Sequence, residues 1–304
     1  MPEKDPLFLP YQIKEKEIHY DASLYLSYWR SGWKKLRANR LAMAALFCLI
    51  GLMLMAIVGP MLTPYTYYDT HLQLKNMKPC KMFWLGSDEL GRDLFTRMWW
   101  GARISLSVGM VAAVLDIIVG VLYGAISGFI GGRVDELLMR FADILHSLPY
   151  LLLVILLMVI LGPGIFTMIV CITITGWINM ARLIRGQILQ LKTTDFALAI
   201  KALGASRWRI LLKHLIPNTL GSIVTMLTLT IPTAIFAEAF LSFLGLGVQA
   251  PIASLGTMAH DGLSALRYYP WRLFFPAGCI CITMLCFNIL GDALRDALDP
   301  RIHL

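Results

Sequence analysis

The stretch ISLSVGMVAAVLDIIVGVLYGAISGF, residues 104–129, contains a single charged residue, Asp116. It is longer than the roughly 20 apolar residues that an α-helix needs to cross the hydrocarbon core of a bilayer. Lipid offers no hydrogen-bond partner to backbone N–H and C=O groups, so a segment of this kind must satisfy them internally, as a helix does. The stretch therefore predicts a membrane-spanning helix.

Five further runs share this length and composition. Of the 304 residues, 58% are hydrophobic and 15% are charged, whereas a soluble domain carries about 25% charged residues. We therefore predict an all-α, polytopic membrane protein with six transmembrane helices. The predicted spans are Leu41–Thr63, Ile104–Phe129, Leu137–Leu161, Ile165–Ala181, Thr219–Leu246 and Leu273–Leu294.

The distribution of lysine and arginine predicts the orientation of these spans. Residues 1–40 contain eight basic residues and residues 182–213 contain seven, whereas the opposite loops, 64–103 and 248–272, contain six and two. By the positive-inside rule, both termini and the 182–217 loop face the cytoplasm. The chain then divides into a cytoplasmic N-terminal tail, residues 1–40, and a six-helix transmembrane domain, residues 41–304. The tail ends in a basic and aromatic segment around Leu24–Arg37 that we expect to lie at the membrane interface.

The composition argues against several classes of function. The net charge of +8 comes from basic residues at the membrane flanks, where anionic headgroups attract them, so membrane lipid is an expected partner and nucleic acid is not. The six histidines are scattered along the chain and never stand at ligand spacing, so we predict neither a metal site nor a catalytic centre. No G-x-x-x-x-G-K-[ST] motif occurs, so we expect no nucleotide or other cofactor to bind this chain alone.

The segment DFALAIKALGASRWRILLKHLIPN, residues 195–218, is a basic interruption between two apolar runs. Apolar residues recur in it at helical spacing, and Gly204, Ala205 and Ser206 form a small-residue break where the chain can turn. Pro217 is expected to end the element just before the next span. The pattern predicts helix, turn, helix and proline, either as a docking element for a soluble partner or as a loop lying on lipid headgroups.

In its order and spacing this segment resembles the "EAA" coupling loop of ATP-binding-cassette importer permeases. That pattern is Glu-Ala-Ala, three residues, Gly, nine residues, then Ile-x-Leu-Pro. Gly204 and Pro217 fall on its Gly and Pro, and Ala199 on its first Ala. Ile216 falls on the Leu of the pattern. The departures are Leu198 in place of the Glu, Ile200 in place of the second Ala and His214 in place of the Ile.

Further segments extend the resemblance to roughly residues 30–304. They are WLGSDELGRDLFTRMWWGARISL (84–106), GGRVDELLMRFADILHSLP (131–149), GWINMARLIRGQIL (176–189), AEAFLSFLGLGVQAP (237–251) and FNILGDALRDALDPR (287–301). Together they resemble the permease subunits of dipeptide and oligopeptide importers in the bacterial inner membrane, with a type I importer fold. The resemblance implies four partners: a homologous second permease subunit, two ATPase subunits that bind ATP and Mg²⁺, and an extracytoplasmic peptide-binding protein. The substrate stays open among oligopeptides, dipeptides, glutathione and nickel complexes.

By this resemblance, the 182–217 loop would place a short coupling helix in a cleft of one ATPase. Gly204 would allow close approach, Trp208 would fill a pocket, and Arg207 and Arg209 would meet acidic surface, unless the two arginines are only solvated topology markers. The residues expected to carry the docking are Ala199, Gly204, Ala205, Ser206, Arg207, Trp208, Arg209 and Pro217.

The outer segment 64–103 contains GSDELGRD, whose spacing matches no Ca²⁺-binding loop. We interpret it as a turn-rich cap that contacts the binding protein. The residues expected to make this contact are Asp88, Glu89, Arg92 and Asp93.

Ionisable groups at membrane depth are costly, so each is a functional hypothesis. Asp116 is expected to face protein or water, either on the translocation path or in a pairing with a neighbouring helix, and Asp143 to pair with Arg140 one helical turn away. Glu238 follows Pro232, which can bend the helix and is a candidate hinge. Glu238 is expected either beside the translocation path or between packed helices. Buried carboxyl groups leave one alternative, a proton-coupled secondary transporter, although the internal repeats typical of that class are absent from this sequence.

Overall fold

The computed structural model describes residues 23–298, with side chains from residue 30 to residue 297. Within that range the regular structure is helical, and the only strand pairing is an isolated bridge between Ser87 and Asp93. The helices are α1 (Ser23–Ala38), α2 (Arg40–Val58), α3 (Leu94–Ile130), α4 (Gly132–Ser147), α5 (Tyr150–Leu161), α6 (Ile165–Leu191), α7 (Asp195–Ala202), α8 (Arg207–Ile210), α9 (Ile216–Asn218), α10 (Leu220–Phe243), α11 (Leu255–Ala265) and α12 (Trp271–Leu298). Short 3-10 turns follow α2 (Gly59–Met61) and precede α3 (Leu72–Leu74), and a π-helical turn (Leu211–Leu215) joins α8 to α9.

Five helices of the described chain are long and apolar enough to cross a membrane: α2 with its 3-10 extension, α3, α6, α10 and α12. The number rises to six if the pair α4 and α5 forms one bent span. The prediction of an all-α polytopic membrane protein is therefore confirmed. Residues 1–22 of the predicted N-terminal tail lie outside the described residues.

The third predicted span, Leu137–Leu161, corresponds to two helices joined at a bend. The chain breaks between α4 and α5, and the two helices differ in direction by 87°. Pro149 stands at the break as the residue preceding α5, and Leu148 before it is extended, with φ −73° and ψ 136°. Proline lacks an N–H group and sterically disfavours helical backbone at the residue before it. A hydropathy pattern cannot register this break, because the apolar residues continue through it.

Two other spans extend well beyond their apolar stretches. Helix α3 begins at Leu94 rather than near residue 104, because the Asp93 side chain accepts a hydrogen bond from the Thr96 N–H at 2.9 Å and caps it. Helix α6 continues past Ala181 to Leu191. Backbone hydrogen bonds stabilise a helix in water as well as in lipid, so caps and glycines decide where these helices end.

Helix α3 forms the centre of the bundle, and its contact with α6 depends on glycines. A Cβ atom added at Gly120, Gly124 or Gly128 would meet backbone oxygen atoms of α6, which belong to Trp177, Ala181 and Arg185 respectively. Glycines four residues apart lie on one helix face and let two backbones approach closely, as in small-xxx-small packing. The resulting contact is the most extensive between any two helices of the described chain.

Two ion pairs attach α4 to α6. Asp135 accepts hydrogen bonds from Nε and Nη2 of Arg185 at 2.5 and 2.7 Å, and Asp143 accepts one from Nη2 of Arg182 at 2.7 Å. The predicted pairing of Asp143 with Arg140 was therefore wrong, since Arg140 pairs instead with Glu136. A sequence shows neighbours along a helix, whereas the partner of Asp143 lies on another helix.

We expect Arg185→Met to lower the free energy of unfolding by about 1–3 kcal/mol, because the mostly buried carboxylate of Asp135 loses its guanidinium partner. Thermal unfolding of the purified protein would measure this change. Arg140→Met is the matched control, since the pair of Arg140 with Glu136 is exposed and contributes at most about 0.5 kcal/mol. Equal losses in the two variants would contradict a specific role for the Asp135 pair.

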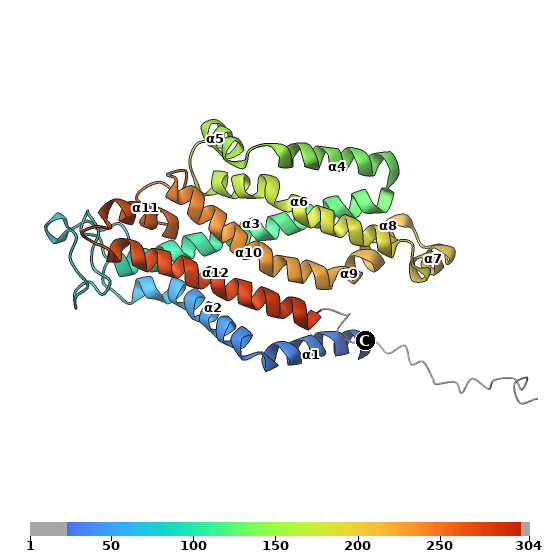
Figure 1. The fold of residues 1–304 in the computed structure, drawn as a ribbon, viewed down its shortest axis with the longest axis horizontal. Helices are drawn as coiled ribbons and strands as arrows, with labels where there is room; N and C mark the ends of the chain where they lie inside the picture. Colours follow the sequence, from blue (N-terminus) through green and yellow to red (C-terminus); the bar gives the residue numbers. More distant parts are fainter. Residues whose placement is uncertain (1–22, 299–304) are drawn as a thin grey trace, which may run out of the picture.

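The long axis of the molecule separates two ends that are built from different segments (Figure 1). At one end, here called the loop end, lie α7, α8, the first described turn of α1 and the last turns of α12. At the other, here called the cap end, lie residues 62–93 and helix α11. The candidate docking segment and the GSDELGRD segment therefore occupy opposite ends of the bundle.

Candidate functional site

The segment that runs from α7 through α9 is anchored to the bundle by a small set of apolar side chains. Ile210, Leu211 and Leu215 are almost fully buried, and together with Ala197 they pack against Ile184 and Ile188 of α6. Each fully buried aliphatic side chain contributes about 1.5–3 kcal/mol of hydrophobic free energy. The segment is therefore held firmly, although it projects from the end of the bundle.

The same segment also exposes several large apolar side chains, here called the α7–α8 surface. Leu203 is 87% exposed and Trp208 is 60% exposed. Several large apolar residues exposed within one short segment, rather than one alone, typically mark an interaction surface. The other exposed large apolar side chains of the segment are Phe196, Leu198 and Leu212.

Gly204 forms the turn between α7 and α8. Its φ of +81° lies in the left-handed region that glycine adopts without strain. Its N–H donates to the carbonyl of Lys201, and the N–H of Ala205 donates to the carbonyl of Ile200, so the C-terminal carbonyl groups of α7 are satisfied. No heavy atom of the described chain lies within 4 Å of a Cβ built on Gly204. The glycine thus makes a tight turn and leaves open space beside it.

Pro217 does not end the helix, contrary to the sequence prediction. It lies in the first turn of α9, where a missing N–H group is tolerated. The turn before it is π-helical, with the N–H of Ile216 donating to the carbonyl of Leu211 five residues earlier. The chain therefore passes from α8 into α10 through helical turns, and α8 to α9 form an almost continuous extension of α10.

The structure brings most of the predicted docking residues to the surface. Ala199, Ser206, Arg207 and Arg209 are exposed with Gly204 and Trp208, whereas Ala205 is half-buried. The hydroxyl of Ser206 accepts from the N–H of Arg209 and caps α8. The prediction omitted Leu203, the most exposed of the apolar residues on this surface. Its position directly before a turn-forming glycine could have singled it out.

At the cap end, Asp88 organises the GSDELGRD segment. It accepts hydrogen bonds from Nε of Arg92 at 2.6 Å and from the backbone N–H groups of Leu90 and Arg92, and it lies 3.4 Å from Nε of Arg97. The turn is tightened by Gly91, whose φ is +72° and whose Cα lies against the carbonyl group of His71. Asp88, Arg92 and Arg97 are all at least nine-tenths buried, so they stabilise the cap from within.

The four residues predicted to contact a binding protein differ in exposure. Asp88, Arg92 and Asp93 are buried, whereas the side chain of Glu89 is 55% exposed and pairs with Arg272 at 3.2 Å. Burial raises the pKa of the Asp93 carboxyl group, and its hydrogen bonds with Thr96 oppose that rise. Of the four, Glu89 presents surface to a partner.

Two buried carboxyl groups lie within the membrane-spanning helices α3 and α10. Asp116 of α3 is 2% exposed and faces Gly176 of α6, and its Oδ1 has no hydrogen-bond partner among the described residues. Glu238 of α10 is fully buried and accepts a hydrogen bond from Ser242 at 2.8 Å. Its other carboxyl oxygen, Oε2, has no hydrogen-bond partner among the described residues.

Glu238 is therefore placed between packed helices. Pro232, six residues before it, lies within the continuous helix α10, and its role as a hinge stays a prediction. Among residues 23–298, no group of three His, Cys, Asp or Glu side chains is placed to hold a metal ion.

Two family models match the chain. Residues 120–304 match the binding-protein-dependent transport system inner membrane component, and residues 27–79 match the N-terminal transmembrane domain of oligopeptide transport permease C. The first match covers more than half of the chain.

Individual proteins support these matches. The chain is 59% identical over 278 residues to the oligopeptide transport system permease protein OppC of Bacillus subtilis, covering 91% of each chain. It is 52% identical over 300 residues to the dipeptide transport system permease protein DppC of the same organism, covering 98% of this chain and 94% of that one. Among solved structures, an inward-facing MetNI methionine ABC transporter chain aligns with a TM-score of 0.55 and 20% identity, covering 66% of this chain and 94% of that chain. The last similarity concerns the fold alone.

Proposed function

Because the chain belongs to the family of binding-protein-dependent transport system inner membrane components, we propose that it is a pore-forming subunit of an ATP-driven importer of oligopeptides or dipeptides. The observation that carries this proposal is the exposed apolar surface of α7 and α8, which is anchored on α6 and lies at one end of a membrane-spanning bundle. The names of the relatives favour peptides as substrates, and oligopeptides first, since the most similar of the relatives given above transports them.

The α7–α8 surface is the proposed docking site for an ATPase subunit. Leu203 and Trp208 would enter a cleft of that partner, and the open side of Gly204 would admit its backbone. ATP and Mg²⁺ would bind the two partner ATPases, so this chain would contribute movement rather than hydrolysis. The buried contacts of Leu211 and Leu215 with α6 and α3 supply a mechanical path from the docking site into the membrane domain.

The direction of the chain in the membrane follows from the same assignment. The loop end faces the cytoplasm in this proposal, and the described chain begins with α1 and ends with α12 on that side of the bundle. The cap end then lies outside the bacterial cytoplasmic membrane and faces the peptide-binding protein, with Glu89 exposed on it. A homologous second permease subunit would complete the pore.

The test is affinity purification of the chain from its own membrane in mild detergent, followed by mass spectrometry. We expect a second permease subunit and two ATPases with nucleotide-binding motifs to accompany it. Recovery of the chain alone, or only as a homo-oligomer, would contradict the proposal.

A proton-coupled secondary transporter is the alternative, because Asp116 and Glu238 are buried in membrane helices. The neutral isosteres Asp116→Asn and Glu238→Gln separate the two mechanisms, since they preserve shape and remove the titrating proton. We expect both variants to retain ATP-driven uptake within about twofold of wild type, a difference of about 0.4 kcal/mol. Uptake into proteoliposomes, with and without a protonophore, measures this. Loss of uptake in both variants, together with protonophore sensitivity of the wild type, would favour the alternative.

A further inference from the structure

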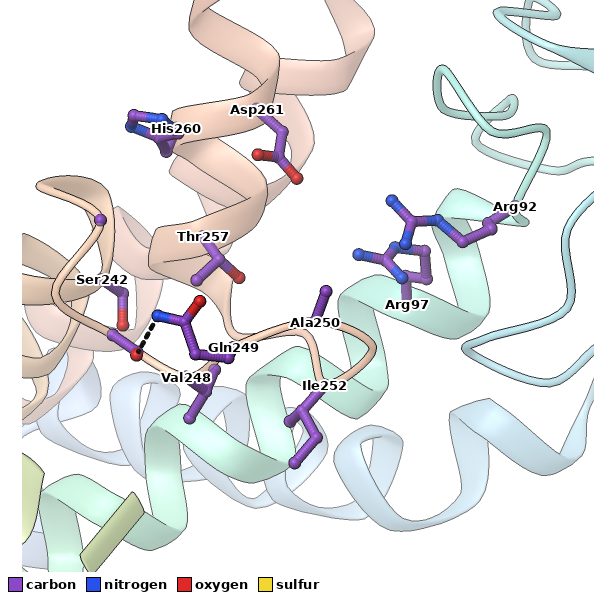
Figure 2. Close-up of a pocket in the computed structure, with 12 residues that line it drawn as sticks. Arg92, Arg97, Ser242, Val248, Gln249, Ala250, Ile252, Thr257, His260 and Asp261 are labelled. Atoms are coloured by element: carbon purple, nitrogen blue, oxygen red, sulfur yellow. Dashed lines mark hydrogen bonds between the residues drawn. The ribbon is translucent and has the colours of Figure 1, made fainter. Parts of the chain in front are cut away.

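A cavity of about 190 Å³ opens at the cap end, between the N-terminal end of α3, the loop 244–252 and helix α11 (Figure 2). Its rim includes the exposed residues Gln249, Ala250 and His260, so it communicates with the surface. It lies away from the α7–α8 surface and plays no part in the docking described above.

Two arginines form one wall of this cavity. Figure 2 shows the guanidinium groups of Arg92 and Arg97 directed toward it. Nε of Arg92 pairs with Asp88, while Nη1 of Arg97 donates to the carbonyl of Tyr67 at 2.8 Å. Neither terminal nitrogen of Arg92, nor Nη2 of Arg97, has a hydrogen-bond partner within residues 23–298. Both residues are more than nine-tenths buried and line the cavity. A hydrogen-bond acceptor for these nitrogens would therefore have to lie in the cavity.

The opposite wall carries a negative charge. The carboxyl group of Asp261 on α11 points toward the two arginines across the cavity (Figure 2). No ion pair within 4.0 Å and no side-chain hydrogen bond of this group occurs in the described part of the chain. Burial raises the pKa of Asp261, with Glu89 acting in the same direction, while Arg97 and Arg92 oppose the rise. The positive guanidinium groups of Arg92 and Arg97 and the carboxyl group of Asp261 therefore face each other across the cavity without direct contact.

The size of the cavity limits what can bridge this gap. A cavity of about 150 Å³ admits a molecule of six heavy atoms such as benzene, whereas pockets for drug-sized ligands measure about 300–1,000 Å³. The cavity is thus adequate for a free amino acid with a small side chain and too small for an oligopeptide. An acidic side chain inserted by another protein would satisfy the arginines and leave Asp261 without a partner.

We propose that this cavity binds a zwitterion of amino-acid size, with its carboxylate group against Arg92 and Arg97 and its ammonium group against Asp261. Charge-assisted hydrogen bonds form at both ends of such a ligand, and Thr257 and Gln249 line the wall between them. The site lies at the cap end, away from the α7–α8 surface, and this proposal does not depend on the transport function.

Equilibrium dialysis with radiolabelled L-alanine tests this on the full chain in lipid nanodiscs, with whatever subunits accompany it. We expect saturable binding in the wild type and a loss of affinity of about tenfold or more in Asp261→Asn, because a hydrogen bond to a charged group contributes about 1.5–3 kcal/mol. The same substitution should leave propionate binding unchanged or strengthen it, since propionate has no ammonium group. Arg92→Gln should weaken both probes.

Arg267→Gln is the matched control, because Arg267 lies at the same end of the molecule on the exposed surface and outside the cavity lining. Asp261 makes no side-chain bond that the asparagine would break, so the variant is expected to fold, and its thermal unfolding checks this. Equal alanine affinity in wild type and Asp261→Asn would overturn the proposal. Absence of saturable alanine binding at concentrations up to about 10 mM would also overturn the proposal, because this range detects a binding free energy as weak as about −3 kcal/mol. Binding of propionate that exceeds that of alanine would instead identify a simple anion site.

Discussion

Replacing Gly204 with leucine is expected to abolish peptide uptake while leaving the protein inserted in the membrane. Two effects combine at this residue. A side chain at φ +81° costs about 1–2 kcal/mol of backbone strain, and it fills the open space through which we propose a partner ATPase approaches. We expect uptake of a radiolabelled peptide to fall by about tenfold or more, equivalent to 1.4 kcal/mol or more. The ATPases should be lost on co-purification, or should hydrolyse ATP without transport.

The control for Gly204 isolates backbone strain from docking. Gly162, at the end of α5, has a φ of +77° and no heavy atom within 4 Å of an added Cβ. Gly162 also has a ψ of 162°, a backbone region that is essentially restricted to glycine, so Gly162→Leu imposes at least as much strain away from the α7–α8 surface. Comparable loss of uptake in both variants would assign the effect to strain, and normal uptake in Gly204→Leu would remove the coupling assignment altogether.

Replacing Gly124 with leucine should prevent the bundle from folding. The added Cβ would collide with the carbonyl oxygen of Ala181 and would lie 2.9 Å from its Cα atom. These are backbone atoms of α6, so relief requires the two most extensively packed helices to separate. Overpacking a core costs about 1–3 kcal/mol when side chains can adjust, and we expect a larger loss here. Fluorescence-detected size exclusion of the tagged protein in detergent measures the folded fraction.

Gly51→Leu on α2 is the corresponding control, since no heavy atom lies within 4 Å of a Cβ at that position. It adds the same side chain to another membrane helix and should leave the elution profile unchanged. Gly124→Ala should fall between the two. Folding of Gly124→Leu at the wild-type level would show that the α3–α6 contact is more adaptable than its geometry indicates.

Local patterns in the chain predicted the helices and the turn of residues 195–210 well. The apolar spacing around Gly204 indicated two helices and a turn, and α7, Gly204 and α8 follow in that order. This success has a local cause, because a glycine at positive φ and a serine cap act on their immediate neighbours. The same reasoning was wrong at Pro217. This residue lies in the first turn of α9, directly after a π-helical turn, and the helical turns continue past it in spite of its missing N–H group. The repeated glycines of α3 were visible in the sequence and were overlooked, although a four-residue period is typical of close helix packing.

The amino-acid sequence by itself determined the membrane environment and the helical class of this protein. Long uncharged runs can satisfy their backbone groups in lipid only as helices, and no distant contact is needed for that conclusion. The tertiary structure alone decided which charged residues are buried and with which partners. Asp143 pairs with Arg182 on another helix, and Asp261 faces Arg92 and Arg97 across a cavity formed by segments far apart in the chain. Electrostatic interactions depend on distance in space and on exclusion of water, and neither is encoded in the neighbours of a residue along the chain.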